Sequence, residues 1–396
     1  MSSNKLIPDL RFPEFENEGE WEEKLVSQLA EYENGKAHEQ DINEEGKYVV
    51  VNSKFISTDG EVRKFTNSAN CIARADDILM VLSDVPNGRA IAKCFYVDRD
   101  NFYTVNQRIC KLTPTNADSK ILYYLLNRNS HFLSFDDGVK QTNLRNEDVL
   151  NCPIILPKSP QEQQKIASCL SSLDELISAH NIKLELLKDH KKGLMQNLFP
   201  QEGEKVPKYR FTEFEKDGEW VEKKLGEVAE NLDSKRIPIT STQREKGSIP
   251  YYGASGIIDY VKDFIFDETL LCISEDGANL IDRNYPIAFT ISGKTWVNNH
   301  SHVLRFANFD TQILVEKYIN SINVQDFLTG MAQPKLNRGK LDIIPIPLPK
   351  NPKEQQKIAS CLSSLDALIT AQAEKIAQLK VHKKGLMQGL FPRMND

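Results

Sequence analysis

The chain has 396 residues, of which 27% are charged and 40% hydrophobic, and its formal net charge is −6. That length exceeds what one hydrophobic core usually fills, so we expect at least two domains. No apolar run approaches the roughly 20 residues of a membrane span, and the first residues lack an apolar stretch of signal-peptide length, so we expect a cytoplasmic protein. The seven cysteines form no CxxC pair, which argues against a zinc ribbon or a disulfide framework.

The first recognisable segment is a lead-in at 7–31, IPDLRFPEFENEGEWEEKLVSQLAE, which recurs at 206–230 as VPKYRFTEFEKDGEWVEKKLGEVAE. Pro8-Asp9 and Glu22-Glu23-Lys24 of the first copy loosely fit the PD…ExK spacing of metal-dependent nucleases. In the second copy Lys208 replaces Asp9, while the arginine, the phenylalanines, the glycine and the tryptophan are kept. We therefore interpret the lead-in as a packing segment rather than a nuclease site.

A variable region follows each lead-in, at about 32–140 and about 231–331. Short runs rich in Val, Ile, Phe and Tyr and bounded by turn residues predict strands. These runs are KYVVVNS, DDILMVLS and GRAIAKCFYV in the first region, and SIPYYGASG, ETLLCIS, PIAFTISG and HVLRF in the second. One helical stretch is expected in each region, at 120–128 and at 311–322. We therefore expect two α/β domains.

The variable regions end in related segments. KQTNLR at 140–145 corresponds to AQPKLNR at 332–338, so that Gln141 matches Gln333 and Leu144 matches Leu336. The Pro-rich strands NCPIILP and IIPIPLP follow.

Two nearly identical segments, 161–200 and 353–392, come next and agree at 29 of 40 positions. Apolar residues in alternating steps of four and three predict a heptad seam along each helix. The seam residues are Ile166, Leu170, Leu173, Ile177, Leu184 and Leu187 in the first helix, and Ile358, Leu362, Leu365, Ile369, Ile376 and Leu379 in the second. Two such helices bury each other most simply as an intramolecular antiparallel pair.

Polar residues interrupt both helices at matching positions. His180 and Gln372 break the seam, either to fix its register or because the seam is partly solvated there. The lysine pairs at 191–192 and 383–384 either complement the helix dipole or contact phosphates or a partner subunit.

The predicted fold class is thus α/β, with two α/β domains separated by a pair of long antiparallel coiled-coil helices in a pseudo-two-fold internal repeat. The expected segments are 1–157 for the first lead-in and domain, 158–199 for the first helix, 200–349 for the second lead-in and domain, and 350–392 for the second helix.

This organisation resembles the specificity subunit of type I restriction-modification systems. The resemblance is carried by the blocks GVKQTNL…PIILPKSPQEQQKIASCLSSLDELI and GMAQPKLNR…IPIPLPKNPKEQQKIASCLSSLDALI, and by the ends KKGLMQNLFP and KKGLMQGLFP. It implies that each variable region is a target-recognition domain that reads one half of a split sequence in double-stranded DNA. It also implies that the helices set the spacing of the half-sites and dock two modification (methyltransferase) subunits, which ATP-dependent restriction subunits join.

The same resemblance implies a chain without catalysis or cofactors of its own. S-adenosylmethionine is then expected on the modification subunits, and ATP with Mg on the restriction subunits. The sequence agrees, because it contains neither a GxxxxGK[ST] phosphate loop nor the methyltransferase tetrapeptide of Asn or Asp, two prolines and an aromatic residue. Because the chain is acidic, we expect tight DNA binding only together with the partner.

DNA-reading side chains are expected among the Arg, Lys, Asn, Gln, hydroxyl and aromatic residues of the loops between strands. In the first domain the candidates are Lys36, Asn52, Lys54, Arg63, Lys64, Asn87, Arg89, Asn106, Gln107 and Arg108. In the second they are Arg236, Arg244, Tyr251, Tyr252, Ser274, Asn279, Lys294, Trp296, Asn298, Asn299 and His302.

Several of these candidates have an alternative structural interpretation. Trp296 and the two tyrosines also fit a core position, and each loop residue also fits a solvated surface. We predict no metal site, because no acidic or cysteine partner lies at ligand spacing from His300 and His302. The alternative function, which the acidic charge favours, is a non-catalytic coiled-coil adaptor that presents two protein-binding domains.

Overall fold

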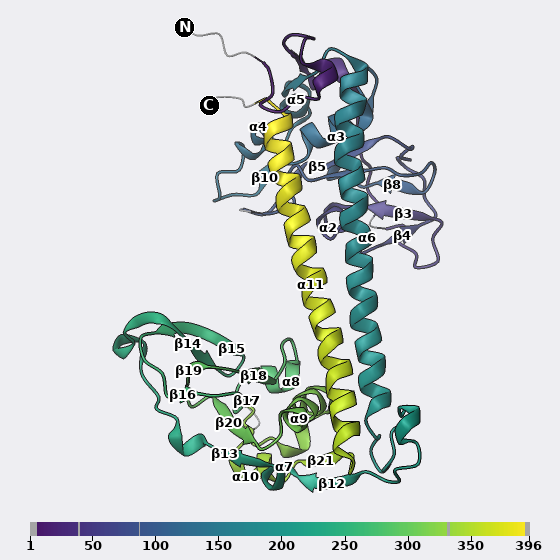
Figure 1. The fold of residues 1–396 in the computed structure, drawn as a ribbon. Helices are drawn as coiled ribbons and strands as arrows, with labels where there is room; N and C mark the ends of the chain where they lie inside the picture. The colour runs from purple at the N-terminus through teal and green to yellow at the C-terminus, as the bar shows by residue number, and fades with distance from the viewer. Residues whose placement is uncertain (1–5, 39, 87, 331–332, 393–396) are drawn as a thin grey trace. The chain divides into compact units, whose positions relative to one another are not determined.

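The computed structural model describes residues 6–38, 40–86, 88–330 and 333–392. The chain forms two compact units: unit 1 is Met1–His180 with Lys375–Asp396, and unit 2 is Asn181–Glu374 (Figure 1). Each unit therefore contains one variable region, the first part of the helix that follows it, and the last part of the other helix. The four sequence segments remain our proposal for the functional parts of the chain.

The two long helices are α6 (Pro160–Leu198) and α11 (Pro352–Leu390). Proline at the first helical position has no amide hydrogen to leave unpaired, and a second proline follows the end of each helix. The side-chain amide of Gln163 donates to the carbonyl of Pro157, and the side-chain amide of Gln355 donates to the carbonyl of Pro349, both at 2.7 Å. The end of the Pro-rich strand and the start of the helix are therefore joined in the same way in both copies.

Unit 1 contains two principal sheets. The first has the order β2-β9-β5-β7, and the second has the order β4-β3-β8, in which β3 and β8 are parallel. The strands are β1 (Glu22–Leu25), β2 (Ala30–Asn34), β3 (Tyr48–Val51), β4 (Phe65–Thr66), β5 (Ile78–Val81), β6 (Ser83–Asp84), β7 (Cys94–Tyr96), β8 (Tyr103–Val105), β9 (Ile109–Pro114), β10 (Thr142–Asn143) and β11 (Pro153–Leu156). The helices are η1 (Pro13–Phe15), α1 (Val26–Leu29), α2 (Ser53–Ser57), α3 (Ser119–Leu126), α4 (Ser130–Leu133) and α5 (Asn146–Leu150).

Unit 2 repeats this plan with the sheets β13-β20-β17-β18 and β15-β14-β19-β16, in which β14 and β19 are parallel. Its strands are β12 (Val221–Lys224), β13 (Ala229–Asn231), β14 (Lys246–Gly253), β15 (Gly256–Val261), β16 (Phe266–Asp267), β17 (Leu270–Ser274), β18 (Ala288–Ile291), β19 (Lys294–Val297), β20 (Ser301–Phe306) and β21 (Pro345–Leu348). Its helices are η2 (Thr212–Phe214), α7 (Leu225–Val228), η3 (Asp233–Lys235), η4 (Ser241–Gln243), α8 (Asn279–Asp282), α9 (Phe309–Ser321), η5 (Gln325–Phe327) and α10 (Arg338–Asp342).

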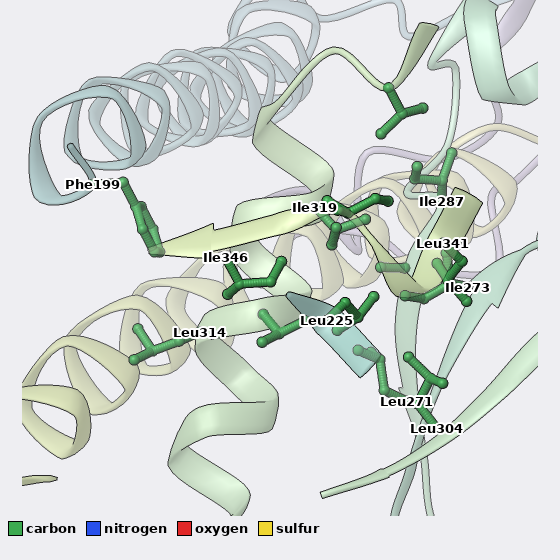
Figure 2. Close-up of a cluster of buried hydrophobic side chains, with 14 of the residues drawn as sticks. Phe199, Leu225, Leu271, Ile273, Ile287, Leu304, Leu314, Ile319, Leu341 and Ile346 are labelled. Atoms are coloured by element: carbon green, nitrogen blue, oxygen red, sulfur yellow. The ribbon is translucent and has the colours of Figure 1, made fainter. Parts of the chain in front are cut away.

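The main core of unit 2 lies between its first sheet, α9 and the long helices. Figure 2 shows Leu271, Ile273 and Leu304 from the sheet together with Leu314 and Ile319 of α9. Phe199, Ile358 and Leu362 belong to the same buried cluster. Because sheet, short helix and long helix share one core, the α/β domain of unit 2 is anchored directly to the long helices.

Two sequence expectations about strands need correction. Each lead-in contains an unpredicted strand: β1 pairs with β11 and β12 pairs with β21, both antiparallel. The run 88–97, predicted as a strand, is one only at Cys94–Tyr96, because its first part turns around Asp84. The Asp84 carboxylate accepts hydrogen bonds from the amides of Ala90 and Ile91, and these local bonds replace a strand ladder.

Candidate nucleic-acid interface

A buried ion pair fixes each lead-in to the start of its long helix. In unit 1 the Arg11 guanidinium makes two 2.8 Å hydrogen bonds to the carboxylate of Glu162, and the Trp21 indole donates to the same carboxylate at 3.2 Å. In unit 2 Arg210 binds Glu354 at 2.7 and 2.8 Å. This bidentate geometry is the strong form of the pair.

The Trp220 indole completes the second copy, donating to Glu354 at 3.3 Å. The hydrogen bond to the glutamate raises the pKa of each arginine, against the opposing effect of burial. We call each of these arginine, glutamate and tryptophan contacts a lock. The lead-in that contains the loosely nuclease-like motif is thus held to the helix start by Arg11 and Trp21, which both copies keep.

The two long helices run antiparallel inside each unit, and a matched ion pair joins them. In unit 1 Lys383 of α11 binds both carboxylate oxygens of Asp174 of α6, and Tyr124 donates to Asp174 at 2.7 Å. In unit 2 Lys191 of α6 forms an ion pair with Asp366 of α11. One lysine of each lysine pair is thus engaged between helices, a role that the sequence interpretation did not include.

Most of the predicted seam residues are buried where the helices meet. Ile166, Leu170, Ile358 and Leu362 lie in the domain cores. The remaining buried members are Ile177, Leu365, Ile376 and Leu379, and the half-buried members are Leu173, Leu184, Leu187 and Ile369.

The candidate interface in unit 1 begins where β3 and β8 end side by side. Because these strands are parallel, the residues that follow them, Asn52 and Asn106, leave at the same edge, and the amide of Asn106 donates to the carbonyl of Val51 at 3.0 Å. The amide of Lys36 donates to the carbonyl of Val105 at 2.9 Å and brings a third loop to this edge.

The adjoining loop 106–108 is held on both sides. The Asn106 side-chain oxygen accepts from the amide of Gln107 at 2.9 Å, and the carbonyl of Arg108 accepts from the amide of Leu82 at 2.9 Å. Ser83, next to Leu82, is the β-ladder partner of Asn143 of β10. The side-chain amide of Gln141 donates to the Ser83 hydroxyl at 2.6 Å. We define loop cluster 1 as Asn52, 106–108, Ser83, Gln141 and Asn143.

Unit 2 builds the same frame from different residues. The amide of Asn298 donates to the carbonyl of Tyr252 at 3.0 Å, and the Asn298 side-chain oxygen accepts from the amide of His300 at 2.8 Å. The carbonyl of His300 accepts from the amide of Glu275 at 2.8 Å, and Asp276 forms a β-bridge with Lys335. We define loop cluster 2 as Gly253, 298–300, Asp276, Gln333 and Lys335.

A model of the type I restriction modification DNA specificity domain matches this chain twice, at residues 18–188 and at residues 217–381. The two matches cover both variable regions and most of both long helices.

The chain belongs to the family of type I restriction-modification specificity subunits.

Individual relatives have the same description. The chain is 27% identical, over an alignment 423 positions long, to the type I restriction enzyme MjaVIII specificity subunit of Methanocaldococcus jannaschii, and the alignment covers 98% of this chain and 94% of the relative. It is 38% identical over 150 residues to a Haemophilus influenzae protein described as a type I restriction enzyme specificity subunit, and it spans 38% of that relative's length.

Solved structures support the fold. The crystal structure of a type I restriction-modification S subunit from M. genitalium matches with a TM-score of 0.68 and 18% sequence identity, covering 98% of this chain and all of the other. A chain from a structure of the type I R-M system matches with a TM-score of 0.52 and 16% identity over 94% of this chain. The predicted fold class and family are therefore confirmed. In the described part of the chain, no helix combines the length and apolar character that crossing a bilayer requires.

The candidates of the first domain of this specificity subunit are mainly accessible. Lys36, Lys54, Arg63, Lys64, Arg89, Gln107 and Arg108 are exposed, and Asn52 and Asn106 are half-buried. Asn52 also caps α2 by accepting from the amide of Phe55. Arg63 and Lys64 are not members of loop cluster 1, but they lie near it: β4 runs antiparallel to β3, and the carbonyl of Lys64 accepts from the amide of Val50 at 2.8 Å, beside the end of β3. Asn87 lies outside the described residues.

The candidates of the second domain are mainly used inside the fold. Tyr251, Ser274, Asn298 and His302 are buried, only Lys294 and Asn299 are exposed, and the others are half-buried. The Trp296 indole donates to the carbonyl of Ile237 at 2.7 Å. Arg244 lies over the ring of Tyr251, 4.3 Å from its centre, and Asn279 closes the turn to Tyr285 through two 3.0 Å hydrogen bonds. Tyr252 stacks on Phe289.

A charged network lies beneath loop cluster 2. His302 contacts Asp233 at 2.6 Å and the carbonyl of Leu336 at 2.7 Å, and Arg236 binds Glu275 at 2.8 Å. Burial opposes ionisation of Asp233 and Glu275. Even so, the pKa of each is lowered, because His302 and Arg236 hydrogen-bond the charged forms. Arg236 also donates to the carbonyl of Ser301 at 2.7 Å, directly behind the loop.

The fold supplies the acidic neighbours of His302 that the sequence did not reveal. Asp233, Glu275 and His302 present oxygen and nitrogen atoms within 4.8 Å of one another. Arg236, however, contacts Glu275 at 2.8 Å and Asp233 at 3.4 Å, so a guanidinium already provides the positive charge. A metal ion would have to approach that cation, and we propose no metal there.

Five residues of the loop clusters are absent from the sequence candidates and are exposed: Gln141, Asn143, His300, Gln333 and Lys335. His300 occupies the position of Arg108, while the candidate His302 points into the buried network. The imidazole of His300 contacts Asp276 at 2.8 Å. Aligning NQR at 106–108 with NNH at 298–300 would have identified His300 as a candidate. That alignment is evident only from the register of the strands that follow these loops.

Proposed function

We propose that this chain is the DNA sequence-specificity subunit of a type I restriction-modification complex and reads a bipartite target. The observation that carries the proposal is the presence of two loop clusters on the same backbone frame with different polar side chains. A shared frame with divergent residues suits two readers of two different half-sites.

The long helices would set the distance between the half-sites and dock the modification subunits. Repeated contacts support a spacing role: the Arg–Glu–Trp locks tie each lead-in to its helix, and the Asp–Lys pairs join the two helices to each other. The chain itself would be non-catalytic, with S-adenosylmethionine and ATP on its partners.

Removing one heptad from each helix tests the spacing role. Deleting 178–184 and 370–376 keeps the four-three alternation of the seam and leaves both Asp–Lys pairs in place. Seven residues of helix are about 10 Å long, which equals roughly three base pairs of DNA. We expect the recognised half-sites to be unchanged and their separation to shorten by about three base pairs, measured by mapping methylated positions in cells that carry the variant.

The matched control duplicates the same heptads, and we expect the separation to lengthen by about three base pairs. An unaltered separation in both variants would refute the spacing role. Assembly with a methyltransferase but without sequence-selective, salt-dependent DNA binding would instead favour the adaptor function.

A further inference from the structure

The two loop clusters contain positions that differ and positions that are identical. Five matched pairs differ: Asn52 and Gly253, Gln107 and Asn299, Arg108 and His300, Ser83 and Asp276, and Asn143 and Lys335. Asn106 and Asn298 are identical, and their side chains hold the loop in both units. Gln141 and Gln333 are also identical, yet both are exposed.

Internal contacts do not explain why this glutamine occurs twice. The Gln141 amide donates to Ser83 at 2.6 Å and to Asn143 at 3.2 Å. In unit 2 those two partners are replaced by Asp276 and Lys335, but the glutamine remains. A residue that persists while its neighbours change is explained better by an external ligand that both units share.

A glycine in the left-handed conformation precedes each of the two glutamines. Each follows a glycine three residues earlier, and both glycines have positive φ, 69° at Gly138 and 83° at Gly330. That left-handed conformation favours glycine in both units. An exposed lysine lies close to each glutamine in the sequence, Lys140 in unit 1 and Lys335 in unit 2.

We propose that Gln141 and Gln333 donate hydrogen bonds to DNA phosphates, one at each half-site, while residues 107–108 and 299–300 read bases. Gln141 has two amide hydrogens, so it keeps the 2.6 Å bond to Ser83 and exchanges the longer, 3.2 Å bond to the exposed Asn143 for the phosphate. The inference rests on the proposed function. Two different half-sites share the sugar-phosphate backbone, and the glutamine amide is a common phosphate donor. The divergent pairs carry the amide, guanidinium and imidazole groups that suit base edges.

The test uses the complete complex with its methyltransferase partner and duplexes that carry the mapped bipartite target or a target with one half randomised. For Gln141→Ala and Gln333→Ala we expect roughly tenfold weaker binding to all of these duplexes, with half-site preference unchanged. Because glutamine is neutral, the slope of log affinity against log salt should not change. The control Lys140→Ala should reduce the magnitude of that slope by about 0.9.

Two further variants make the outcome decisive. Gln141→Glu should bind more weakly than Gln141→Ala, because a carboxylate repels phosphate. Arg108→Ala should change preference at the first half-site alone. Unchanged affinity in the glutamine variants, a loss confined to one base pair, or lost assembly with the methyltransferase would each overturn the inference. Absence of selective binding by the wild-type complex would instead overturn the proposed function.

Discussion

The layer beneath the two loop clusters differs between the two units, although the hydrogen-bonded frame of the loops is the same. In unit 1 the strand register places Cys110, which is fully buried, where unit 2 has His302. Leu82 occupies the position of Glu275. An apolar support in one unit is thus replaced by a charged, hydrogen-bonded support in the other.

This difference shows that divergence between the domains is not confined to their surfaces. A buried charge is costly unless its partners are positioned, so the network of unit 2 fixes the loop by directed hydrogen bonds, while unit 1 relies on packing. The shared locks at the helix starts, by contrast, are built from the same residues in both units. Substitutions in the locks should therefore lower the free energy of unfolding of the two units equally. Substitutions beneath the loop clusters should lower it by different amounts in the two units.

The largest expected effect is at the locks. Glu162→Ala and Glu354→Ala each leave an arginine without its carboxylate, and we expect each to lower the free energy of unfolding of its unit by about 4 kcal/mol. Urea unfolding monitored by tryptophan fluorescence measures this. The Glu→Gln variants, which keep a hydrogen-bond acceptor, serve as controls and should lose less. A loss in one unit and none in the other would break the equivalence of the two locks.

A smaller effect, restricted to unit 2, is expected from Arg236→Met. It leaves Asp233 and Glu275 close together without the guanidinium and should cost about 3 kcal/mol at pH 7. Both carboxylates have a folded-state pKa below the ordinary values of 3.8 and 4.5, so their stabilising contribution is present at neutral pH and is lost as the pH falls below about 4.

Unfolding titrations of Arg236→Met and wild type between pH 7 and pH 3 check the pH dependence. The difference in the free energy of unfolding between wild type and Arg236→Met should shrink toward acid pH, because protonation of Asp233 and Glu275 removes the negative charges that the arginine balances. Cys110→Ser, at the matched site of unit 1, should show no such pH dependence. A difference that stays constant with pH would show that the arginine acts by packing alone.

The smallest effect is expected where the helices are joined. Lys191→Ala and Lys383→Ala remove half-exposed ion pairs, and each should cost about 0.5 kcal/mol, less at high salt. A double-mutant cycle of Lys191 with Asp366 gives the coupling energy. Coupling well above 1 kcal/mol would mean that these pairs, and not the apolar seam, hold the helices together.

The sequence predicted the large features because repetition makes them visible. Two long helices with a heptad pattern, two strand-rich domains and their alternation follow from periodicity and from the duplicated blocks, and the fold confirms them. The lead-in strands were missed, since Glu22–Leu25 and Val221–Lys224 have few apolar residues and become strands through pairing with the Pro-rich segments.

The sequence by itself also determined the family, because the duplicated blocks that carry the resemblance are continuous stretches of the chain. Tertiary structure alone decided which polar residues face the solvent. His302 and His300 are two residues apart, yet one is buried against Asp233 and Glu275 and the other lies in an exposed loop. The reason is physical: burial of a polar side chain depends on partners from distant segments, here residues 233, 275 and 336, and no spacing within the chain encodes that meeting.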